Sequence, residues 1–399
     1  MPISQSDSKS KGSKAGRYLL IVGILFIAFN LRTALASIGP LVSHIRDSTG
    51  LPNSMLGLLT TLPLIAFGVM SSFTSLFTRR FGIGGTLLGA IFLLAAGIAI
   101  RSINGIVTLY LGTILLGVAI AFGNVLLPSL VKKKFSSNSG FITSLYVGVM
   151  GIGAAVASGI SVPLVDKLHW GWRGSLGIWS VSALLAFFIW LPQINRLKST
   201  KQKRSYRIAM KALGKSPVAW QVALFMGLQS LTAYVIMAWL PAILQGRGYT
   251  DEFSGWMSSL AQTTGIVGSL IIPLWAGKKL NQRRIVTFLA TLETVAILGL
   301  LFPQVGLVSL WVSILGFVLG GSFGLALLFI VLRSKDAQAT TELSGMAQSI
   351  GYFIAATGPI IFGSLFDLTG NWNYSLILLL LVAFLKLYAG LGAAKDRKI

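Results

Sequence analysis

The chain has 399 residues, of which 54% are hydrophobic and only 11% are charged, and its formal net charge is +23. Soluble domains carry about a quarter charged residues, so this composition excludes an ordinary water-soluble core and favours a polytopic helical membrane protein. The basic residues lie in short gaps between apolar runs, which favours an effect of membrane topology over nucleic-acid binding.

Twelve apolar runs are long enough to cross a bilayer, because a hydrocarbon core of about 30 Å needs roughly 20 apolar residues in a helix. A polar stretch precedes the first run, which is too long for a cleaved signal peptide. Continuous runs favour helices over barrel strands, which would alternate over about ten residues. In chain order the runs are 18–42, 52–78, 81–100, 104–131, 138–165, 174–194, 217–245, 253–277, 285–303, 306–332, 343–366 and 372–394.

The basic residues between the runs indicate how the helices are oriented. The side that holds both chain ends carries 26 Lys and Arg residues in its tails and gaps. The other side carries five, namely Arg46, Arg101, Lys167, Arg173 and Arg247. Cytoplasmic loops are enriched in Lys and Arg, so we expect a multi-pass protein of the cytoplasmic (inner) membrane with both termini in the cytoplasm.

The widest gap between runs divides them into two sets of six. Residues 195–216 hold eight basic residues and no acidic one. We interpret this segment as a solvated cytoplasmic linker, and binding of a partner or of anionic lipid is the alternative. The predicted organisation is a cytoplasmic tail at 1–17, a six-helix bundle at 18–194, the linker at 195–216, a second six-helix bundle at 217–394 and a tail at 395–399.

The two halves repeat each other at an offset of about 200 residues. "SGFITS" at 139 pairs with "SGMAQS" at 344, and Trp172 in "WGWRGSL" pairs with Trp372 in "GNWNYSL". The common order of such matches supports a duplicated unit. Parallel repeats of six helices are the plan of the major facilitators, so the predicted fold is an all-α membrane protein with twelve transmembrane helices in two pseudo-symmetric halves.

The residues do not form the pattern of an enzyme, a metal site or a cofactor site. The two histidines, His44 and His169, lie near the outer ends of predicted helices, and there is no cysteine. The glycines of "GIGGTLLG" at 82–89 lack a phosphate-loop lysine, and glycines in membrane helices usually allow close packing. We therefore expect a monomeric, non-enzymatic protein without metal or cofactor, whose partners are the bilayer and a small-molecule substrate.

Three ionisable residues lie well inside apolar runs, where a charge is costly and is a functional hypothesis by default. Lys386 is close enough to the cytoplasmic end of its run to extend its ammonium to the interface. Glu293 is a candidate for proton coupling, and a structural hydrogen bond is the alternative. Arg32 lies about 14 residues, or roughly 21 Å, from the start of its helix, in the middle to outer part of the bilayer.

Arg32 is the strongest candidate for substrate contact, because the first helix of the major facilitator plan borders the central cavity. Its guanidinium stays protonated, and its planar fork suits a carboxylate, a nitro-like group or a cyanate-sized acceptor. The alternative is a structural role that ties its helix to carbonyls or to an acid. Asn30 and Thr33 flank Arg32 as local donors and acceptors, and Gly39-Pro40 predicts a bend near the outer end.

Uncharged polar and aromatic residues recur on the other predicted cavity helices. Amides and phenols can orient a small polar solute without the cost of burying further charges, or they can join helices to one another. Gln229 and Arg32 are the preferred pair of candidates for substrate contact. The wider candidate set is Asn30, Asn124, Tyr146, Tyr234, Trp239, Gln262, Thr263, Gln348 and Tyr352.

Three stretches resemble the cyanate permease and 2-nitroimidazole transporter family of major facilitators. They are "FNLRTALASIGPLV" at 29–42, "GLQSLTAYVIMAWLPAIL" at 227–244 and "AQSIGYFIAATGPIIFGSLFDLTGNW" at 347–372. The resemblance covers nearly the whole chain. It implies a twelve-helix inner-membrane transporter of small anions or nitro-heteroaromatics that works by alternating access, and it implies that Asn30, Arg32 and Gln229 matter.

The general facilitator motifs are altered in this chain. The loop after the second run reads "SLFTRRFGIGG", with Ser75 and Arg79 at the positions that usually hold Gly and Asp. The charge relay that the usual motif supplies to the outward-open form is therefore expected to differ. The fifth run also lacks the Gly-Pro of the drug–proton antiporters, and "ATGPIIFG" occurs in the eleventh run instead.

Two functional hypotheses follow from these residues. The first is a secondary transporter of a small anionic or polarised solute that Arg32 holds between the two halves. The second is an exporter of small neutral aromatic drugs or metabolites, bound by Tyr146, Tyr234, Trp239 and Tyr352, in which Arg32 is structural. Proton coupling rests on Glu293 alone, which leaves uniport and exchange open as well.

Overall fold

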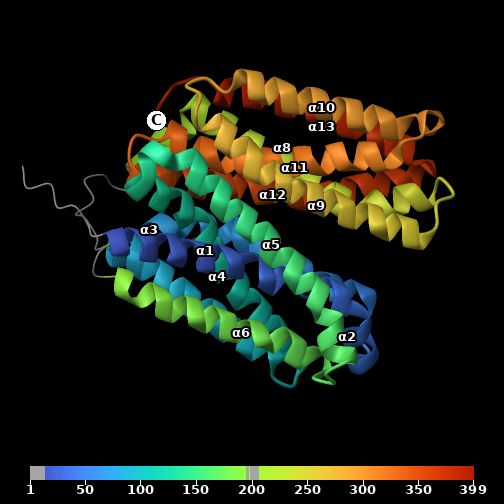
Figure 1. Cartoon of the computed structure of the whole chain (residues 1–399), viewed down its shortest axis with the longest axis horizontal. Helices are drawn as coiled ribbons and strands as arrows, with labels where there is room; N and C mark the ends of the chain where they lie inside the picture. The colour runs from blue at the N-terminus through green and yellow to red at the C-terminus, as the bar shows by residue number, and fades with distance from the viewer. Residues whose placement is uncertain (1–13, 195–196, 198–205) are drawn as a thin grey trace, which may run out of the picture.

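The computed structural model describes residues 14–194, 197 and 206–399, and the regular elements in these ranges are helices (Figure 1). The first half contains α1 (Lys14–Ala36), α2 (Val42–Thr49), α3 (Asn53–Ser102), α4 (Ile106–Phe135), α5 (Ser139–Asp166) and α6 (Gly171–Trp190). The second half contains α7 (Tyr206–Gly214), α8 (Pro217–Gln245), α9 (Asp251–Ala276), α10 (Arg283–Leu301), α11 (Val308–Arg333), α12 (Ala337–Thr369) and α13 (Trp372–Ala393).

Ten helical segments in the described ranges are long and apolar enough to span a membrane, and two of them hold two crossings each. α3 has 50 residues, about 75 Å at 1.5 Å per residue, which is more than twice the thickness of a hydrocarbon core. It is broken at Gly82, whose φ of 70° favours a residue without a side chain. The segment Ile106–Asp166 joins α4 and α5 through the short turn Ser136–Asn138. The ten segments therefore contain the twelve predicted crossings.

The first predicted run extends too far along the chain. α1 ends at Ala36, and a short 3-10 turn at Gly39–Leu41 leads into the separate helix α2. Pro40 lacks a backbone N–H and disfavours helical geometry in the residue before it, so the chain bends here as its sequence predicts. Arg32 thus lies in the last turns of α1, close to the point where the crossing ends.

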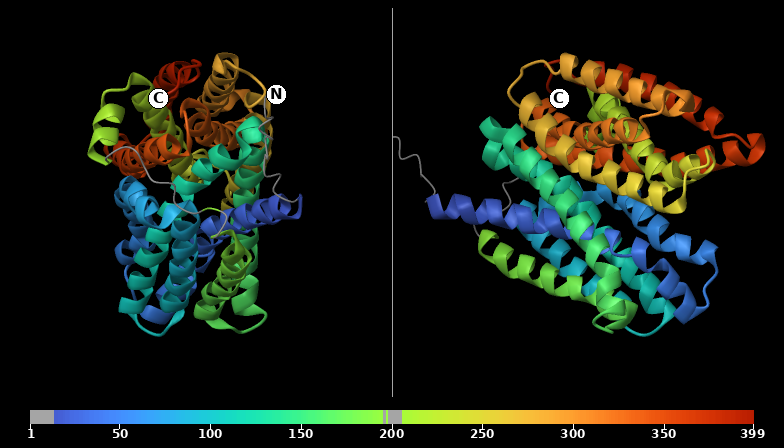
Figure 2. Two further views of the ribbon diagram at one scale, coloured as in Figure 1. Left: turned by 90° about the vertical axis from the view of Figure 1, so that its left-hand side faces the viewer. Right: turned by 45° about the vertical axis from the view of Figure 1, so that its right-hand side comes forward.

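The helices form two bundles that lie side by side, α1–α6 and α8–α13, as the three views of Figures 1 and 2 agree. α1 begins and α13 ends at one end of the molecule, which we call the terminal face. The opposite end, which carries α2, we call the far face. α5 and α9 lie close together near the terminal face and diverge toward the far face (Figure 1).

The contacts between the halves are concentrated toward the terminal face. Gly140, at the start of α5, lies so close to the end of α9 that a Cβ there would be 2.7 Å from the Cα of Gly277. The Thr341 hydroxyl of α12 donates to the Ser129 hydroxyl of α4 at 2.9 Å. Near the opposite end of α5, by contrast, a Cβ on Gly159 would meet nothing within 4 Å. The molecule is closed at the terminal face and open toward the far face.

α9 and α11 make the closest helix-to-helix approach in the second half. A Cβ added to Gly320 of α11 would lie 1.8 Å from the carbonyl oxygen of Gly265 on α9. Small residues allow membrane helices to approach in this way because they have no bulky side chain between the backbones, and the close approach increases the van der Waals contact that holds membrane helices together. This contact forms one wall of the central cavity described below.

We expect Gly320→Ala to destabilise the folded protein by about 1–3 kcal/mol, the usual cost of overpacking, because neither backbone can give way to the added methyl group. Thermal unfolding in detergent, followed by tryptophan fluorescence, measures the change. Gly255→Ala on α9 is the matched control, since a Cβ at Gly255 meets nothing within 4 Å. Equal stability of the two variants would contradict the close approach of α9 and α11.

Candidate functional site

A central cavity with two lobes lies between the halves. The first lobe, of about 260 Å³, is bounded mainly by α8, α9 and α11, with Tyr352 from α12 and Arg32 from α1. The second lobe, of about 520 Å³, lies between α5, α9 and α11. Five residues line both lobes, namely Arg32, Gln262, Gly265, Gly320 and Phe323. We call the first the inner lobe and the second the interface lobe.

The neighbours of Arg32 in the sequence explain why its side chain points into this cavity. Successive residues of a helix are rotated by about 100°, so each faces a different partner. Asn30 donates to the Ser182 carbonyl of α6 at 3.3 Å, and Leu31 packs against Gly123 of α4. Thr33 contacts Gly153 of α5. These contacts occupy three sides of α1 and leave the side of Arg32 facing the cavity.

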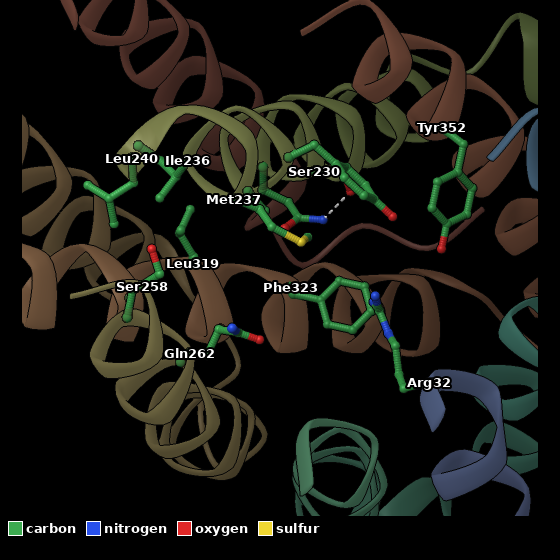
Figure 3. A pocket seen from close by; sticks show the side chains of 17 residues that line it. Arg32, Ser230, Ile236, Met237, Leu240, Ser258, Gln262, Leu319, Phe323 and Tyr352 are labelled. Atoms are coloured by element: carbon green, nitrogen blue, oxygen red, sulfur yellow. Dashed lines mark hydrogen bonds between the residues drawn. The ribbon is translucent and has the colours of Figure 1, made fainter. Parts of the chain in front are cut away.

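The Arg32 guanidinium lies over an aromatic ring rather than beside an acid. Its Cζ is 5.2 Å from the centroid of the Phe323 ring on α11, within the range of a cation–π interaction (Figure 3). It also interacts with the Tyr234 phenol of α8. No Asp or Glu within the described ranges forms an ion pair with Arg32, and none lines either lobe. The cavity is therefore electropositive at its centre.

Gln229 of α8 lines the inner lobe, as predicted for a residue near Arg32. Its amide nitrogen donates to the Ser230 hydroxyl at 2.7 Å and to the Met226 carbonyl at 3.1 Å. Its carbonyl oxygen is buried and has no partner in the described structure. An unpaired buried acceptor is costly, so this oxygen is an unsatisfied polar atom beside the inner lobe.

Tyr352 joins the halves at the base of the inner lobe. Its ring lies 4.9 Å from the ring of Phe67 on α3, and its hydroxyl accepts a hydrogen bond from the Asn124 amide of α4 at 3.1 Å. Asn124 does not line either lobe itself, so it faces the cavity only through Tyr352. Tyr234 lines the inner lobe from α8.

Polar residues of α9 line the wall of the cavity on the other side of Phe323 from Arg32. Gln262 lines both lobes and Thr263 lines the interface lobe, and both side chains are exposed to the cavity. Figure 3 shows Gln262 and Arg32 on opposite sides of Phe323, with Tyr352 beyond. The cavity thus brings together Arg32, Gln229, Tyr234, Gln262 and Tyr352 from the predicted set.

Besides Asn124, four predicted residues lie away from the cavity in this conformation. Asn30 is buried between α1 and α6. The Trp239 indole donates to the Pro359 carbonyl of α12 at 2.9 Å, which fixes α8 against α12. Tyr146 and Gln348 are fully buried, and within the described structure neither polar atom of Gln348 has a hydrogen-bond partner. Substrate contact by these four stays a prediction for another conformation.

Phe323 is a cavity residue that the sequence-based predictions omitted. It lies on α11, the most apolar of the spans, so no polar residue marks the cavity-facing side of that helix. A signal was nevertheless present, since Phe323 is surrounded by glycines in "GGSFG" at 320–324. A bulky ring among small residues on a packed helix suggests that the ring projects into open space.

Lys386 was expected to extend to the membrane interface, and that expectation is wrong. Its side chain is 3% exposed, and its ammonium donates to the Glu293 carboxylate at 2.7 Å. The Glu293 side chain is fully buried, and the pair joins α10 to α13 outside the central cavity. The attraction between the two opposite charges offsets the desolvation penalty of burying them, whereas either charge alone would be buried without compensation.

Two other basic residues also have buried partners that their sequence positions did not indicate. Arg101, counted in a gap on the outer side, lies fully buried in the last turn of α3 and donates to the Ala34 carbonyl at 2.7 Å. Arg79, at the altered motif position, contacts Glu342 of α12 at 3.4 Å. The second contact links the two halves at the terminal face, so a carboxylate on α12 meets a cation on α3.

Comparison with known proteins agrees with this architecture. A sequence model of the Major Facilitator Superfamily matches residues 22–359. The chain is 40% identical to a 2-nitroimidazole transporter of Escherichia coli over 387 residues, which cover 97% of this chain and 98% of that one. It is 26% identical to the cyanate transport protein CynX of E. coli over 354 residues, 88% and 91% of the two chains. The fold of the E. coli fucose:proton symporter FucP superposes with a TM-score of 0.76 at 13% identity, over 94% of this chain and 97% of that chain.

The Glu293–Lys386 pair gives a stability prediction. We expect Glu293→Leu or Lys386→Leu alone to cost about 3–5 kcal/mol, because each leaves an uncompensated charge in the bundle. The double variant should recover most of this loss, since two apolar residues can replace a buried pair at little cost. Thermal unfolding in detergent measures all three variants, and a double variant less stable than both single variants would contradict a mainly structural pair.

Proposed function

The chain belongs to the Major Facilitator Superfamily, and from that premise we propose that it carries a small anionic or strongly polarised solute bound at Arg32. It is a multi-pass membrane transporter rather than an enzyme. The proposal concerns the class of solute and the residue that holds it.

The observation that carries the proposal is the lone charge of Arg32. A guanidinium that faces the cavity without a carboxylate has no fixed counter-charge, and its cation–π contact with Phe323 supplies only part of the missing stabilisation. An anion or a nitro group can accept two parallel hydrogen bonds from the planar fork of Arg32. The solute would then supply the counter-charge that the lining residues lack.

The shape of the inner lobe favours a small ring over a linear anion. The lobe measures about 260 Å³, and much of its lining is apolar, including Met237, Leu319 and Phe323. A heteroaromatic ring could lie against these side chains with its polarised group at Arg32. A cyanate-sized anion would leave most of the lobe unfilled. Nitro-heteroaromatics are therefore the preferred class.

We further propose that the terminal face is cytoplasmic, because it carries most of the basic residues. The described conformation, closed at the terminal face, is then open to the outside. In alternating access the halves rock about the central site, so the contacts at the terminal face would break as the far face closes. Asn30, Tyr146 and Gln348 are candidates for solute contact in that second conformation.

The second hypothesis is an exporter of neutral aromatics in which Arg32 is structural. The contact of Arg32 with Phe323 and the presence of Tyr234 and Tyr352 in the inner lobe are the observations in its favour. Proton coupling through Glu293 stays a prediction, and its test is transport with and without an imposed pH gradient. Competition separates the two hypotheses, because small anions should inhibit transport only if Arg32 binds the solute.

We expect Arg32→Ala to weaken solute binding by about 10- to 100-fold, the worth of a hydrogen bond to a charged group. Arg32→Lys keeps the charge but loses the fork, so it should recover only part of the affinity. The measurement is uptake of 2-nitroimidazole into proteoliposomes as a function of concentration.

Arg46→Ala is the control for this series, because Arg46 lies on α2 outside the cavity. Correct insertion of every variant is checked by its yield and thermal unfolding. Unchanged uptake by Arg32→Ala would contradict binding of the solute by Arg32 and would favour the hypothesis of a neutral-aromatic exporter.

Phe323→Leu distinguishes the classes of solute. Loss of the ring should weaken uptake of 2-nitroimidazole by about 2- to 10-fold, since aromatic contacts are worth about 0.5–1.5 kcal/mol. It should change inhibition by cyanate much less, because cyanate has no ring to stack. Equal effects on both solutes would contradict a ring bound against Phe323.

A further inference from the structure

A second large cavity lies on the seam between the halves at the terminal face, and the proposed transport mechanism does not use it. It measures about 1140 Å³. Its walls come from the end of α4, the connection between α9 and α10, the connection between α11 and α12, and the last residues of the chain. We call it the seam cavity.

The seam cavity is strongly basic. Seven Lys and Arg side chains line it, against three Asp and Glu side chains. The lysines are Lys132 and Lys133 from the first half, and Lys278, Lys279, Lys335 and Lys398 from the second half. The topology rule explains why basic residues lie on this face, but it does not explain why lysines from both halves converge on one cavity.

The three acidic side chains of the seam cavity have other partners. Asp396 pairs with Arg333 at 3.2 Å, and Glu342 pairs with Arg79. Asp336 accepts a hydrogen bond from the backbone N–H of Ala339 at 2.8 Å, which caps the start of α12.

The lysines are left without such partners. Within the described ranges, Lys133, Lys278, Lys279, Lys335 and Lys398 form no ion pair. Counting the backbone carboxylate of Ile399, which also lines the cavity, the lining holds seven cationic and four anionic groups, so the positive charge is only partly balanced.

The seam cavity exists because the halves meet. Lys132 of α4 donates to the Val331 carbonyl of α11 at 3.1 Å, which joins the two halves at the cavity wall. When the halves separate at the terminal face, as alternating access requires, the lysines of the first half move away from those of the second. An anion bound among them would contact both halves in the described conformation only.

We propose that the seam cavity binds a phosphate-bearing anion, and that this anion stabilises the conformation closed at the terminal face. Lysine ammonium groups bind phosphate as point charges, and a ligand that binds one conformation more tightly shifts the population toward it. A phospholipid headgroup and a soluble phosphate compound share this chemistry. The inference rests on the alternating access of the proposed function but not on the identity of the solute at Arg32.

The experiment measures the opening of the far face without any transported solute. Because the chain has no cysteine, spin labels can be attached at two introduced residues, Val107→Cys and Leu368→Cys. Both positions are exposed, and they lie on opposite halves at the far face. The distance between the labels reports the ratio of the two conformations in vesicles.

Three conditions are compared, namely phosphatidylcholine alone, phosphatidylcholine with phosphatidylglycerol, and phosphatidylcholine with inorganic pyrophosphate on the terminal side. We expect at least one of the two anions to raise the ratio of far-open to far-closed protein by about fivefold or more, the usual size of coupling between two sites. An effect of phosphatidylglycerol alone identifies the headgroup as the source, and an effect of pyrophosphate identifies a soluble phosphate.

Two variants that remove the same number of charges test whether the anion acts at the seam cavity. Lys278→Gln, Lys279→Gln and Lys335→Gln together should abolish the shift. Arg207→Gln, Lys211→Gln and Lys215→Gln together remove the same charge from exposed positions on and beside α7, outside the seam cavity, and should preserve it.

The inference is overturned if neither anion changes the ratio, or if the α7 variant loses the shift as fully as the cavity variant. The second result would assign the effect to general surface charge. Failure of the proposed solute site is distinguishable, because uptake by Arg32→Ala tests that site, whereas the response of the label distance to anions is measured without a transported solute and is compared between the seam-cavity and α7 variants.

Discussion

The electrostatics of Arg32 is the constraint on which the arrangement of the central cavity depends. A permanently charged group within a bilayer must be paired, solvated or stabilised by polarisable neighbours. The described structure offers Arg32 the face of Phe323 and the phenol of Tyr234, and no acid. The site consequently holds a positive charge that no acidic side chain among the described residues neutralises, which is the basis for proposing an anionic or polarised solute.

Arg32 differs from the other basic residues within the spans in where its partners lie. Arg101 is satisfied by the Ala34 carbonyl, and Lys386 is satisfied by Glu293. Both therefore serve to join helices within one half. Arg32 alone among these three faces a cavity, and its partners come from the other half of the molecule. A solute bound to a cation between the two halves can change the contacts between them, whereas a solute bound to a cation inside one bundle cannot do so directly.

The contacts that close the terminal face are suited to breaking. The hydrogen bond between Thr341 and Ser129 joins neutral groups, and such a bond is worth about 1 kcal/mol net. The ion pair between Arg79 and Glu342, at 3.4 Å, is a charged contact at the same face. Glycines such as Gly140 allow backbones to meet without interlocking side chains. The seam cavity places lysines from both halves close to this closure, and the anion that we propose to bind there would reduce the repulsion between them. The conformations that are closed and open at the terminal face can therefore differ by only a small free energy, as alternating access requires.

The sequence by itself determined the twelve crossings, the bend at Pro40 and the singular position of Arg32, because hydropathy and proline geometry are properties of one segment of chain. Gln229 and Gln262 were among the uncharged polar residues predicted for the cavity helices, and both line the cavity. Tyr146 and Gln348, predicted on the same grounds, are buried away from it. Only the tertiary structure decided that Phe323 receives Arg32 and that Lys386 pairs with Glu293. It likewise decided that Asn30 faces α6, because these facts depend on how each helix is rotated against its neighbours. Rotation is set by packing between distant segments, such as Gly320 against Gly265, and a single helix carries no record of it.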